Sequence, residues 1–218
     1  SDLINRHIRE QHIDLRLNAN LKEILADENG RARAVVLEES GEEIECTVVG
    51  LTPGVSPNIK FLEGSGIQLG RGVKVNRNLE TNFKNIYAIG DCAEQHEAIG
   101  NRRAIEAVWY TARMMGEAVA QNICDNPVKY NPGNWFNSAK FLDIEYQTYG
   151  WVFPEPGEGE AHFYWEHING KKCLTISYEK ASRKFLGINN FGIRMRHEIF
   201  DHWLNEEKSV DHVIENLR

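Results

Sequence analysis

The sequence predicts an α/β architecture followed by an α+β domain, and three observations support this prediction. Residues 86–89 form a short apolar run, typical of a strand buried on both faces, that stops at Gly90-Asp91. An amphipathic helix is expected shortly after it, ending near Ile123. Beyond the segment 126–133, which contains two prolines and a glycine, aromatic strands alternate with turns and two helices follow. Such a mixture predicts more than one folded part in 218 residues.

Composition excludes several classes of function. The chain carries 32 acidic and 25 basic residues, a net charge of -7, without any Lys/Arg-rich block. We therefore expect no nucleic acid and no membrane as a partner. No apolar run is long enough to cross a bilayer and the amino terminus lacks a signal-peptide pattern, so a cytoplasmic location is expected. The four cysteines are widely spaced and form no CxxC pair, which argues against a zinc site and against a redox dithiol. Each is expected to be a small, buried, reduced residue: Cys46, Cys92, Cys124 and Cys173.

The first 50 residues predict a small antiparallel meander. Residues 21–25 and 32–37 flank a turn that ends in Asn29-Gly30, a dipeptide that supplies the positive φ angles of a tight hairpin. A second turn near Gly41 leads into a third strand. The remaining elements expected here are a helix over residues 2–11 and strands over residues 13–17 and 44–49.

Two glycine-containing segments follow. An apolar strand at residues 48–49 enters a loop with Gly54, Pro57 and Asn58, whose backbone path the glycine and prolines restrict. Residues 64–72 superficially resemble a phosphate-binding loop. A dinucleotide fingerprint follows a buried strand and opens a helix, however, whereas this segment leads into the alternating strand 73–75. We therefore interpret residues 64–72 as a turn.

The Gly90-Asp91 step is the strongest functional signal. A strand that ends there places a carboxylate at the carboxyl edge of a sheet, where ligands bind in open α/β folds. Gly90 permits a close backbone approach, and an ionised Asp91 accepts hydrogen bonds from hydroxyl groups. The pattern predicts recognition of a polyol or ribose. An ordinary buried strand followed by a turn is the alternative.

Asn101 is the expected N-cap of the helix that ends near Ile123. The amino terminus of a helix carries partial positive charge and free N–H groups, and it can stabilise an anionic ligand. A plain amphipathic core helix would explain the same pattern. Apolar residues recur on one face at Ile105, Val108, Trp109, Ala112, Met115, Val119 and Ile123.

The carboxyl-terminal part predicts an antiparallel sheet with helices. Asn169-Gly170 indicates a hairpin between residues 161–167 and 173–178. Its aromatic residues are expected to pack in a core, because no basic residues are interleaved with them. His197 and His202 are five residues apart, a spacing that does not align them for a metal ion. The other expected elements are a strand region over residues 139–153, a breaker at 154–157, a strand over 184–189, and helices over 194–204 and 210–217, the last capped near Ser209.

Residues 81–94, together with the segments around Gly54 and before Val73, resemble the pyridine nucleotide-disulfide oxidoreductase family. The resemblance implies that Gly90 and Asp91 contact the ribityl chain of FAD. It further implies that Ile99, Gly100 and Asn101 offer backbone groups to the flavin ring and that Gly54 lies near the nicotinamide of NAD(P)H. The implied organisation is the closing part of an NAD(P)-binding domain (1–75), the closing strand and helix of a FAD-binding domain (76–125) and an interface domain that often forms a dimer (126–218).

Both Gly-x-Gly-x-x-Gly loops of the family are absent. The chain therefore resembles the carboxyl-terminal part of a parent enzyme that passes electrons from NAD(P)H through FAD to an acceptor protein or small molecule. The isolated chain is expected to be inactive and to retain no FAD. No His-Pro-Thr segment of the disulfide reductases is found, which favours the ferredoxin-, rubredoxin- or nitrite-reductase-like branch. No side chain is assigned a catalytic role. A homodimer is expected, and a scaffold module or a disulfide reductase fragment are the alternatives.

Overall fold

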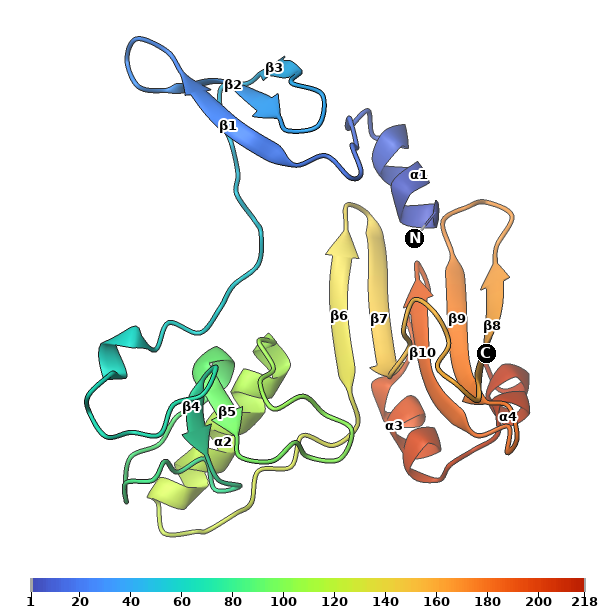
Figure 1. The fold of residues 1–218 in the computed structure, drawn as a ribbon. Helices are drawn as coiled ribbons and strands as arrows, with labels where there is room; N and C mark the ends of the chain where they lie inside the picture. The colour runs from blue at the N-terminus through green and yellow to red at the C-terminus, as the bar shows by residue number, and fades with distance from the viewer. Residues whose placement is uncertain (1, 218) are drawn as a thin grey trace. The chain divides into compact units, whose positions relative to one another are not determined.

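The computed structural model describes residues 2–217, which divide after Val55 into two compact units. The first contains one helix and a small sheet, and the second contains a two-stranded sheet, a long helix and a five-stranded sheet with two helices (Figure 1). Within residues 2–217, no helix is both long enough and apolar enough to span a membrane. The three-part division expected from the sequence, at residues 75 and 125, stays a prediction.

The first unit confirms the predicted helix and meander. Helix α1 (Asp2–Glu10) precedes strands β1 (Leu21–Ala26), β2 (Ala32–Leu37) and β3 (Glu43–Glu45), which pair antiparallel in the order β1-β2-β3. Asp27 fixes the first turn, because its Oδ1 accepts from the backbone N–H groups of Asn29 and Arg31, and Gly30 takes φ +76°.

Two strand predictions in the first unit are wrong, and a third is too long. Residues 13–17 and 48–49 pair with no strand, and β3 ends at Glu45 instead of Val49. Alternation of apolar and polar residues predicts a strand only where a neighbouring backbone completes the ladder. Near residue 16, side chains make the contacts instead, since Arg16 bonds the carboxylates of Asp14 and Glu42.

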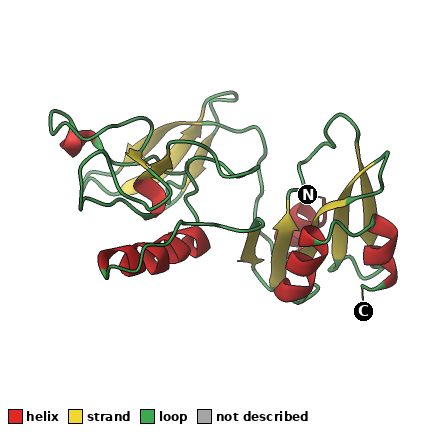
Figure 2. Ribbon diagram, turned by 90° about the horizontal axis from the view of Figure 1, so that it is seen from below, coloured by secondary structure: helices red, strands yellow, loops and turns green. Residues whose placement is uncertain are grey.

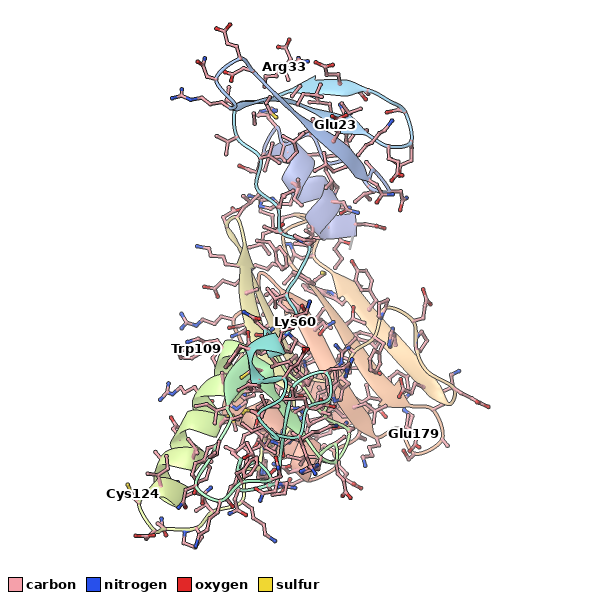
Figure 3. All side chains as sticks on the ribbon, turned by 60° about the vertical axis from the view of Figure 1, so that its left-hand side comes forward. Glu23, Arg33, Lys60, Trp109, Cys124 and Glu179 are labelled. Atoms are coloured by element: carbon pink, nitrogen blue, oxygen red, sulfur yellow. The ribbon has the colours of Figure 1, made fainter. Side chains whose placement is uncertain are left out.

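The second unit begins with a short 3-10 helix at Lys60–Leu62 and a parallel pair of strands, β4 (Val73–Val75) and β5 (Ala93–Gln95). The predicted strand at 73–75 and the interpretation of residues 64–72 as a turn are confirmed. Helix α2 (Trp109–Ile123) packs against this pair, and Trp109 and Cys124 mark its two ends in Figure 3. The shared core consists of Val75, Leu79, Ala93, Met115, Ala118, Val119 and Tyr130.

The strand predicted at residues 86–89 is not formed. This segment makes one isolated bridge, between Glu80 and Tyr87, and Ile86 and Ile89 are 44% and 38% exposed. A central parallel strand requires neighbours on both sides, and β4 and β5 are the only parallel pair in the described residues. The backbone is held instead by hydrogen bonds from Thr81 N to Ile86 O and from Ala88 N to Leu79 O.

Helix α2 starts at Trp109 and not at Asn101, so the prediction of Asn101 as its N-cap is wrong. The N-cap is Val108, whose side chain makes no capping hydrogen bond. Residues 96–108 form a loop, and the hydrogen bond from Gln95 N to Ala104 O (2.9 Å) holds it beside β5. The end of the helix at Ile123 is confirmed.

The predicted antiparallel sheet with helices is confirmed in the carboxyl-terminal part (Figures 1 and 2). A strand region was expected over residues 139–153, and residues 139–150 belong to a hairpin that reverses at Leu142, where φ is +58°. Helices α3 and α4 pack on one face, and Ser209 caps α4 by accepting from His212 N. The elements are β6 (Phe136–Phe141), β7 (Ile144–Gly150), β8 (Glu160–Glu166), β9 (Cys173–Glu179), β10 (Phe185–Phe191), α3 (His197–Asn205) and α4 (Val210–Glu215), with strand order β6-β7-β10-β9-β8.

Candidate functional site

Gly90 and Asp91 lie in a single 3-10 turn, Gly90–Cys92, that leads directly into β5. Gly90 has φ +74°, a conformation that side chains disfavour, and its N–H points to Met115 Sδ at 3.3 Å. The Asp91 side chain is exposed, and within residues 2–217 its carboxylate has no hydrogen-bond partner. A rigid turn therefore presents an unused acceptor to solvent, which fits a ligand with hydroxyl groups.

The amino-terminal half of α2 packs on this turn. A Cβ atom built on Gly90 would lie 3.7 Å from Ala112 Cβ, so the two backbones are in close contact. Because Val108 provides no side-chain cap, the first N–H groups of α2 stay available for an external acceptor. The indole of Trp109 is 67% exposed at the same end. This end of the helix can donate hydrogen bonds to an electron-rich group.

Ile99, Gly100 and Asn101 form a turn in the loop before α2. The hydrogen bond from Arg102 N to Ile99 O (3.0 Å) closes the turn, and Gly100 takes φ +59°. Asn101 and Gly100 are exposed, and a Cβ atom on Gly100 would meet nothing within 4 Å. Gly100 and Asn101 are therefore open to solvent, whereas Ile99 is half-buried with its carbonyl already bonded, and none of the three stands at a helix terminus.

Gly54 belongs to the first unit and lies in an irregular segment. It is exposed and has φ +95°, and the space around it is open. The backbone conformation explains why glycine suits this position, as the sequence predicted. Gly54 and Asp91 belong to different units.

Arg102 and Glu106 form a buried ion pair that the sequence analysis missed. Their side chains are only 4% and 5% exposed, and Arg102 Nε donates to Glu106 Oε1 at 2.6 Å while Nη2 donates to Oε2. Arg102 Nη1 also donates to three successive carbonyls, those of Pro132, Gly133 and Asn134. The Arg-x-x-x-Glu spacing was the available signal, but that spacing is common on exposed helices.

Stacked aromatic rings continue from this ion pair. The Arg102 guanidinium lies 5.1 Å from the centre of the Trp135 ring, and Trp135 stacks on Trp151 at 4.8 Å with 6° between the planes. Phe153 stacks in turn on Trp151. Trp135 precedes β6 and Trp151 follows β7, so the stack joins the loop before α2 to the start of the carboxyl-terminal sheet.

An apolar hollow of about 320 Å³ lies beside the predicted strand 86–89. Apolar side chains dominate its lining, and several of them are substantially exposed, including Phe61. Exposed apolar surface of this kind marks a place where further structure or a ligand packs. The lining includes Ile59, Phe61, Leu62, Ile67, Ile86 and Ile89.

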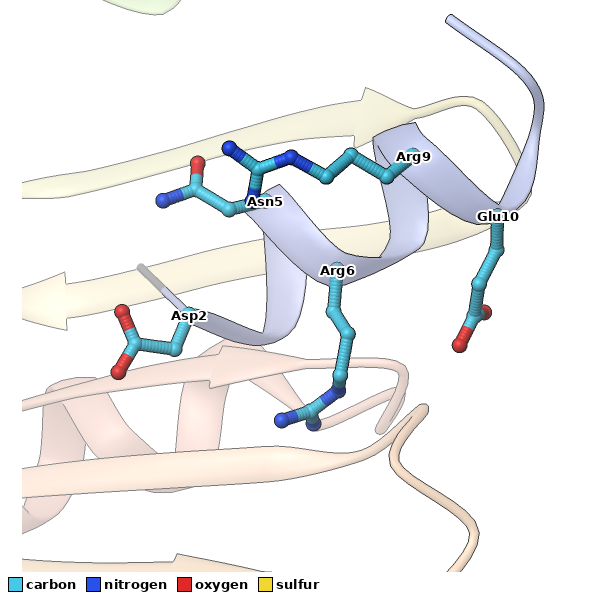
Figure 4. A pocket seen from close by; sticks show the side chains of 5 residues that line it. All are labelled: Asp2, Asn5, Arg6, Arg9 and Glu10. Atoms are coloured by element: carbon cyan, nitrogen blue, oxygen red, sulfur yellow. The ribbon is translucent and has the colours of Figure 1, made fainter.

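A second hollow, in the first unit, contains none of the predicted site residues. It is lined by polar side chains of α1, namely Asp2, Asn5, Arg6, Arg9 and Glu10 (Figure 4). Among the described residues, no three His, Cys, Asp or Glu side chains are grouped to hold a metal ion. Within residues 2–217, no cysteine forms a disulfide bond. Cys173 is buried as predicted, Cys46 and Cys92 are half-buried, and Cys124 is exposed, contrary to the prediction.

Solved structures share this fold, and they define its class. The chain superposes on a FAD-dependent pyridine nucleotide-disulphide oxidoreductase from Desulfovibrio vulgaris with a TM-score of 0.79 and 18% identity, covering 100% of this chain and 56% of that one. It superposes on a ferredoxin reductase from Rhodopseudomonas palustris with a TM-score of 0.74 and 21% identity, covering 88% and 45%. The fold is thus that of part of a larger FAD- and NAD-dependent oxidoreductase.

The family follows from the sequence comparison. The family model "Pyridine nucleotide-disulphide oxidoreductase" matches residues 1–116, more than half of the 218 residues, and the chain belongs to this family. The family resemblance predicted from the sequence is therefore confirmed. It is a family of NAD(P)H-dependent oxidoreductases.

Curated relatives are considerably longer than this chain. A 5,5'-dehydrodivanillate O-demethylase ferredoxin reductase subunit from Sphingobium is 34% identical over 144 residues, which are 65% of this chain and 34% of that protein. An NAD(P)H sulfur oxidoreductase (CoA-dependent) from Pyrococcus furiosus is 28% identical over 148 residues, 66% of this chain and 32% of that protein. An assimilatory nitrate reductase electron transfer subunit from Bacillus subtilis is 32% identical over 145 residues, 66% and 18%. The matched region thus spans about a third or less of each relative.

Proposed function

We propose that this chain supplies the ribityl-contacting turn, the ring-facing helix terminus and the carboxyl-terminal sheet of a FAD-dependent NAD(P)H oxidoreductase. The observation that carries the proposal is Asp91, whose exposed carboxylate has no hydrogen-bond partner within residues 2–217. Asp91 lies in a glycine turn before β5, not at the carboxyl end of a strand as the sequence predicted, and an exposed carboxylate in this turn can accept hydrogen bonds from a hydroxylated ligand. FAD, when bound, supplies the transfer of electrons from NAD(P)H to an acceptor.

Each proposed contact has a defined physical role. Asp91 accepts hydrogen bonds from the ribityl hydroxyls, and Gly90 lets the backbone approach them without a side chain in the way. Ile99, Gly100 and Asn101 contribute backbone groups. The positive end of α2 faces the ring and stabilises negative charge on it, a role that the sequence assigned to a helix beginning at Asn101. Gly54 shapes the backbone near the nicotinamide.

The apolar hollow beside residues 86–89 supports an assembly with more sheet than the described residues contain. Ile86 and Ile89 remain exposed, whereas strands of parallel sheets are normally covered on both faces. The relatives are about three times as long as the matched region. We propose that segments corresponding to the remaining length of the relatives pair beside residues 86–89 and bind the FAD pyrophosphate.

We propose that the chain belongs to the branch of the family that resembles ferredoxin, rubredoxin or nitrite reductases. Relatives include a ferredoxin reductase subunit, a rubredoxin-NAD(+) reductase and a nitrate reductase electron transfer subunit. One solved structure with this fold is a covalent putidaredoxin reductase–putidaredoxin complex. By analogy, the acceptor of the whole protein is a small electron-transfer protein. We also propose a homodimer through the carboxyl-terminal sheet, which sedimentation of the whole protein would test.

The decisive experiment is Asp91→Ala in the whole flavoprotein. Loss of a charged hydrogen-bond acceptor costs about 1–3 kcal/mol, so the dissociation constant of FAD should rise about 5- to 150-fold. The measurement is a FAD titration of the apoprotein, followed by flavin fluorescence. Asp14→Ala is the control, because it removes an exposed carboxylate from the first unit.

Two outcomes separate the alternatives. Unchanged FAD affinity in Asp91→Ala would refute the role of Asp91. A whole protein that binds no flavin at all would favour a non-catalytic scaffold derived from the same family. For the isolated 218 residues we expect no stoichiometric FAD, because the proposed pyrophosphate contacts come from other segments, and absorbance spectroscopy of the purified chain would test this.

A further inference from the structure

The Arg102–Glu106 pair connects three elements around the proposed flavin site. On one side, Glu106 lies just before α2, and its backbone carbonyl accepts from Val108 N (3.0 Å) and from Thr111 Oγ1 (3.1 Å). Glu106 therefore makes two kinds of contact: its carboxylate binds Arg102, and its backbone carbonyl anchors the first turn of this helix. Two hydrogen bonds thus connect Glu106 to the amino terminus of α2.

On the other side, Arg102 is tied to both of the neighbouring segments. Its backbone N–H closes the turn that contains Gly100, and its Nη1 group binds the carbonyls of residues 132–134. The same guanidinium lies against Trp135, immediately before β6. One side chain thus joins the loop before α2 to the first strand of the carboxyl-terminal sheet.

Stability alone is a weak reason for this arrangement. Burying two charges costs several kcal/mol per ion, and well-packed apolar residues often give equal or greater stability. What the ion pair adds is geometry, because the guanidinium is planar and donates its hydrogen bonds in fixed directions. Here Nε and Nη2 donate to the two oxygens of one carboxylate, and Nη1 donates to three successive carbonyls.

We propose that Arg102 and Glu106 are positioning residues that hold the amino terminus of α2 at a fixed place relative to the flavin ring and the carboxyl-terminal sheet. The proposal rests on the proposed function. Free N–H groups at a helix terminus stabilise negative charge only within the first turn, so a small displacement weakens them. Loosening the pair therefore disfavours the anionic reduced flavin and lowers its reduction potential, while the ribityl contact at Asp91 is retained.

The test compares flavin midpoint potentials and visible spectra in the whole flavoprotein. Arg102→Met and Glu106→Gln should change the ratio of reduced to oxidised flavin at a given potential by about three- to tenfold, and tenfold corresponds to about 30 mV for a two-electron couple. FAD stoichiometry should stay near one. Arg102→Lys should not restore the potential, because an ammonium cannot reproduce the planar set of donors.

Arg183→Met is the control. Arg183 and Asp211 form an exposed ion pair between the β9–β10 turn and α4, with side chains 45% and 56% exposed, and neither residue belongs to α2 or to the loop before it. This variant should leave the potential unchanged. If Arg102→Met fails to fold, the double variant Arg102→Met/Glu106→Leu replaces the ions by apolar side chains and favours a folded protein.

The outcomes distinguish the proposed flavin-binding function from the positioning role of Arg102 and Glu106. A wild-type protein without FAD would refute the proposed function. A wild-type protein with FAD, and a folded Arg102 or double variant with an unchanged flavin potential and spectrum, would overturn the positioning role alone. A shifted potential in the Arg102 and Glu106 variants, with none in Arg183→Met, would support it.

Discussion

Glu94→Gln offers a sharp test of the packing around β4 and β5. The Glu94 side chain is about 10% exposed, and its two oxygens have different partners: Oε1 bonds Lys74 Nζ at 2.6 Å and Oε2 accepts from Gly72 N at 2.9 Å. Burial raises the pKa of Glu94, but the hydrogen bonds and charge of Lys74, with the Gly72 N–H, outweigh it, so its pKa lies below the ordinary value. The ionised form is therefore the one that the fold stabilises.

The magnitude follows from these contacts. Hydrogen bonds to a charged group contribute about 1.5–3 kcal/mol, and those to a neutral group about 0.5–1.5 kcal/mol. Glutamine keeps one oxygen as an acceptor for Gly72, and Lys74 is exposed enough to remain hydrated. We therefore expect Glu94→Gln to lower the free energy of unfolding at pH 7 by about 1–2 kcal/mol.

The pH dependence gives the sign of the effect. Since the pKa of Glu94 is lower in the folded than in the unfolded state, its contribution is complete above the unfolded pKa of about 4.3 and disappears as pH falls through the folded pKa. The difference between wild type and Glu94→Gln should therefore shrink at pH 3. Urea unfolding at pH 7 and pH 3, followed by circular dichroism, measures it.

The control is Glu117→Gln, which alters an exposed ion pair on α2 and should cost about 0.3–0.5 kcal/mol. If wild type and Glu94→Gln differ by the same amount at both pH values, the stabilisation does not come from the ionised carboxylate and the reasoning fails.

Further predictions concern the carboxyl-terminal sheet. Gly150→Ala should destabilise by on the order of 3 kcal/mol, because Gly150 has φ +68° and a Cβ atom there would lie 2.2 Å from Leu186 O; Gly159→Ala, with φ +80° but open space, should cost only about 1 kcal/mol. Equal melting temperatures for the two variants would contradict this. Ser209→Ala removes the N-cap hydrogen bond of α4 and should cost about 1 kcal/mol, while Ser209→Asp should retain most of the stability; thermal unfolding measures both.

Local chemistry made some elements predictable from the sequence. Asn29-Gly30 and Asn169-Gly170 identified two hairpins, and in each turn the glycine supplies the positive φ angle, +76° at Gly30 and +65° at Gly170. Ser209 identified the start of α4 for a similarly local reason. The end of α2 was predicted well, and so was the family, since both depend on contiguous residues.

Elements that depend on distant partners were predicted poorly. Residues 86–89 have the composition of a central strand, but a strand exists only beside other strands, and these residues make one isolated bridge. Asn101 has the side chain of an N-cap, yet the interactions of Arg102 with residues 30 positions away keep this region out of the helix. The reversal at Leu142 was missed because leucine rarely takes a positive φ.

The contacts of Arg102 also bear on how the protein can be divided experimentally. The segment from Asn126 to Gly133 has the prolines and glycine of a flexible connector, and a protein engineer would choose it as a cutting point. The carbonyls of Pro132 and Gly133 in this segment, and that of the adjacent Asn134, however, accept hydrogen bonds from Arg102, which precedes α2 in the sequence. A carboxyl-terminal sheet expressed from Asn134 onward would lose the guanidinium that lies against Trp135, and the remaining piece would keep Arg102 bonded to Glu106, Pro132 and Gly133 but without Asn134 and the Trp135 ring.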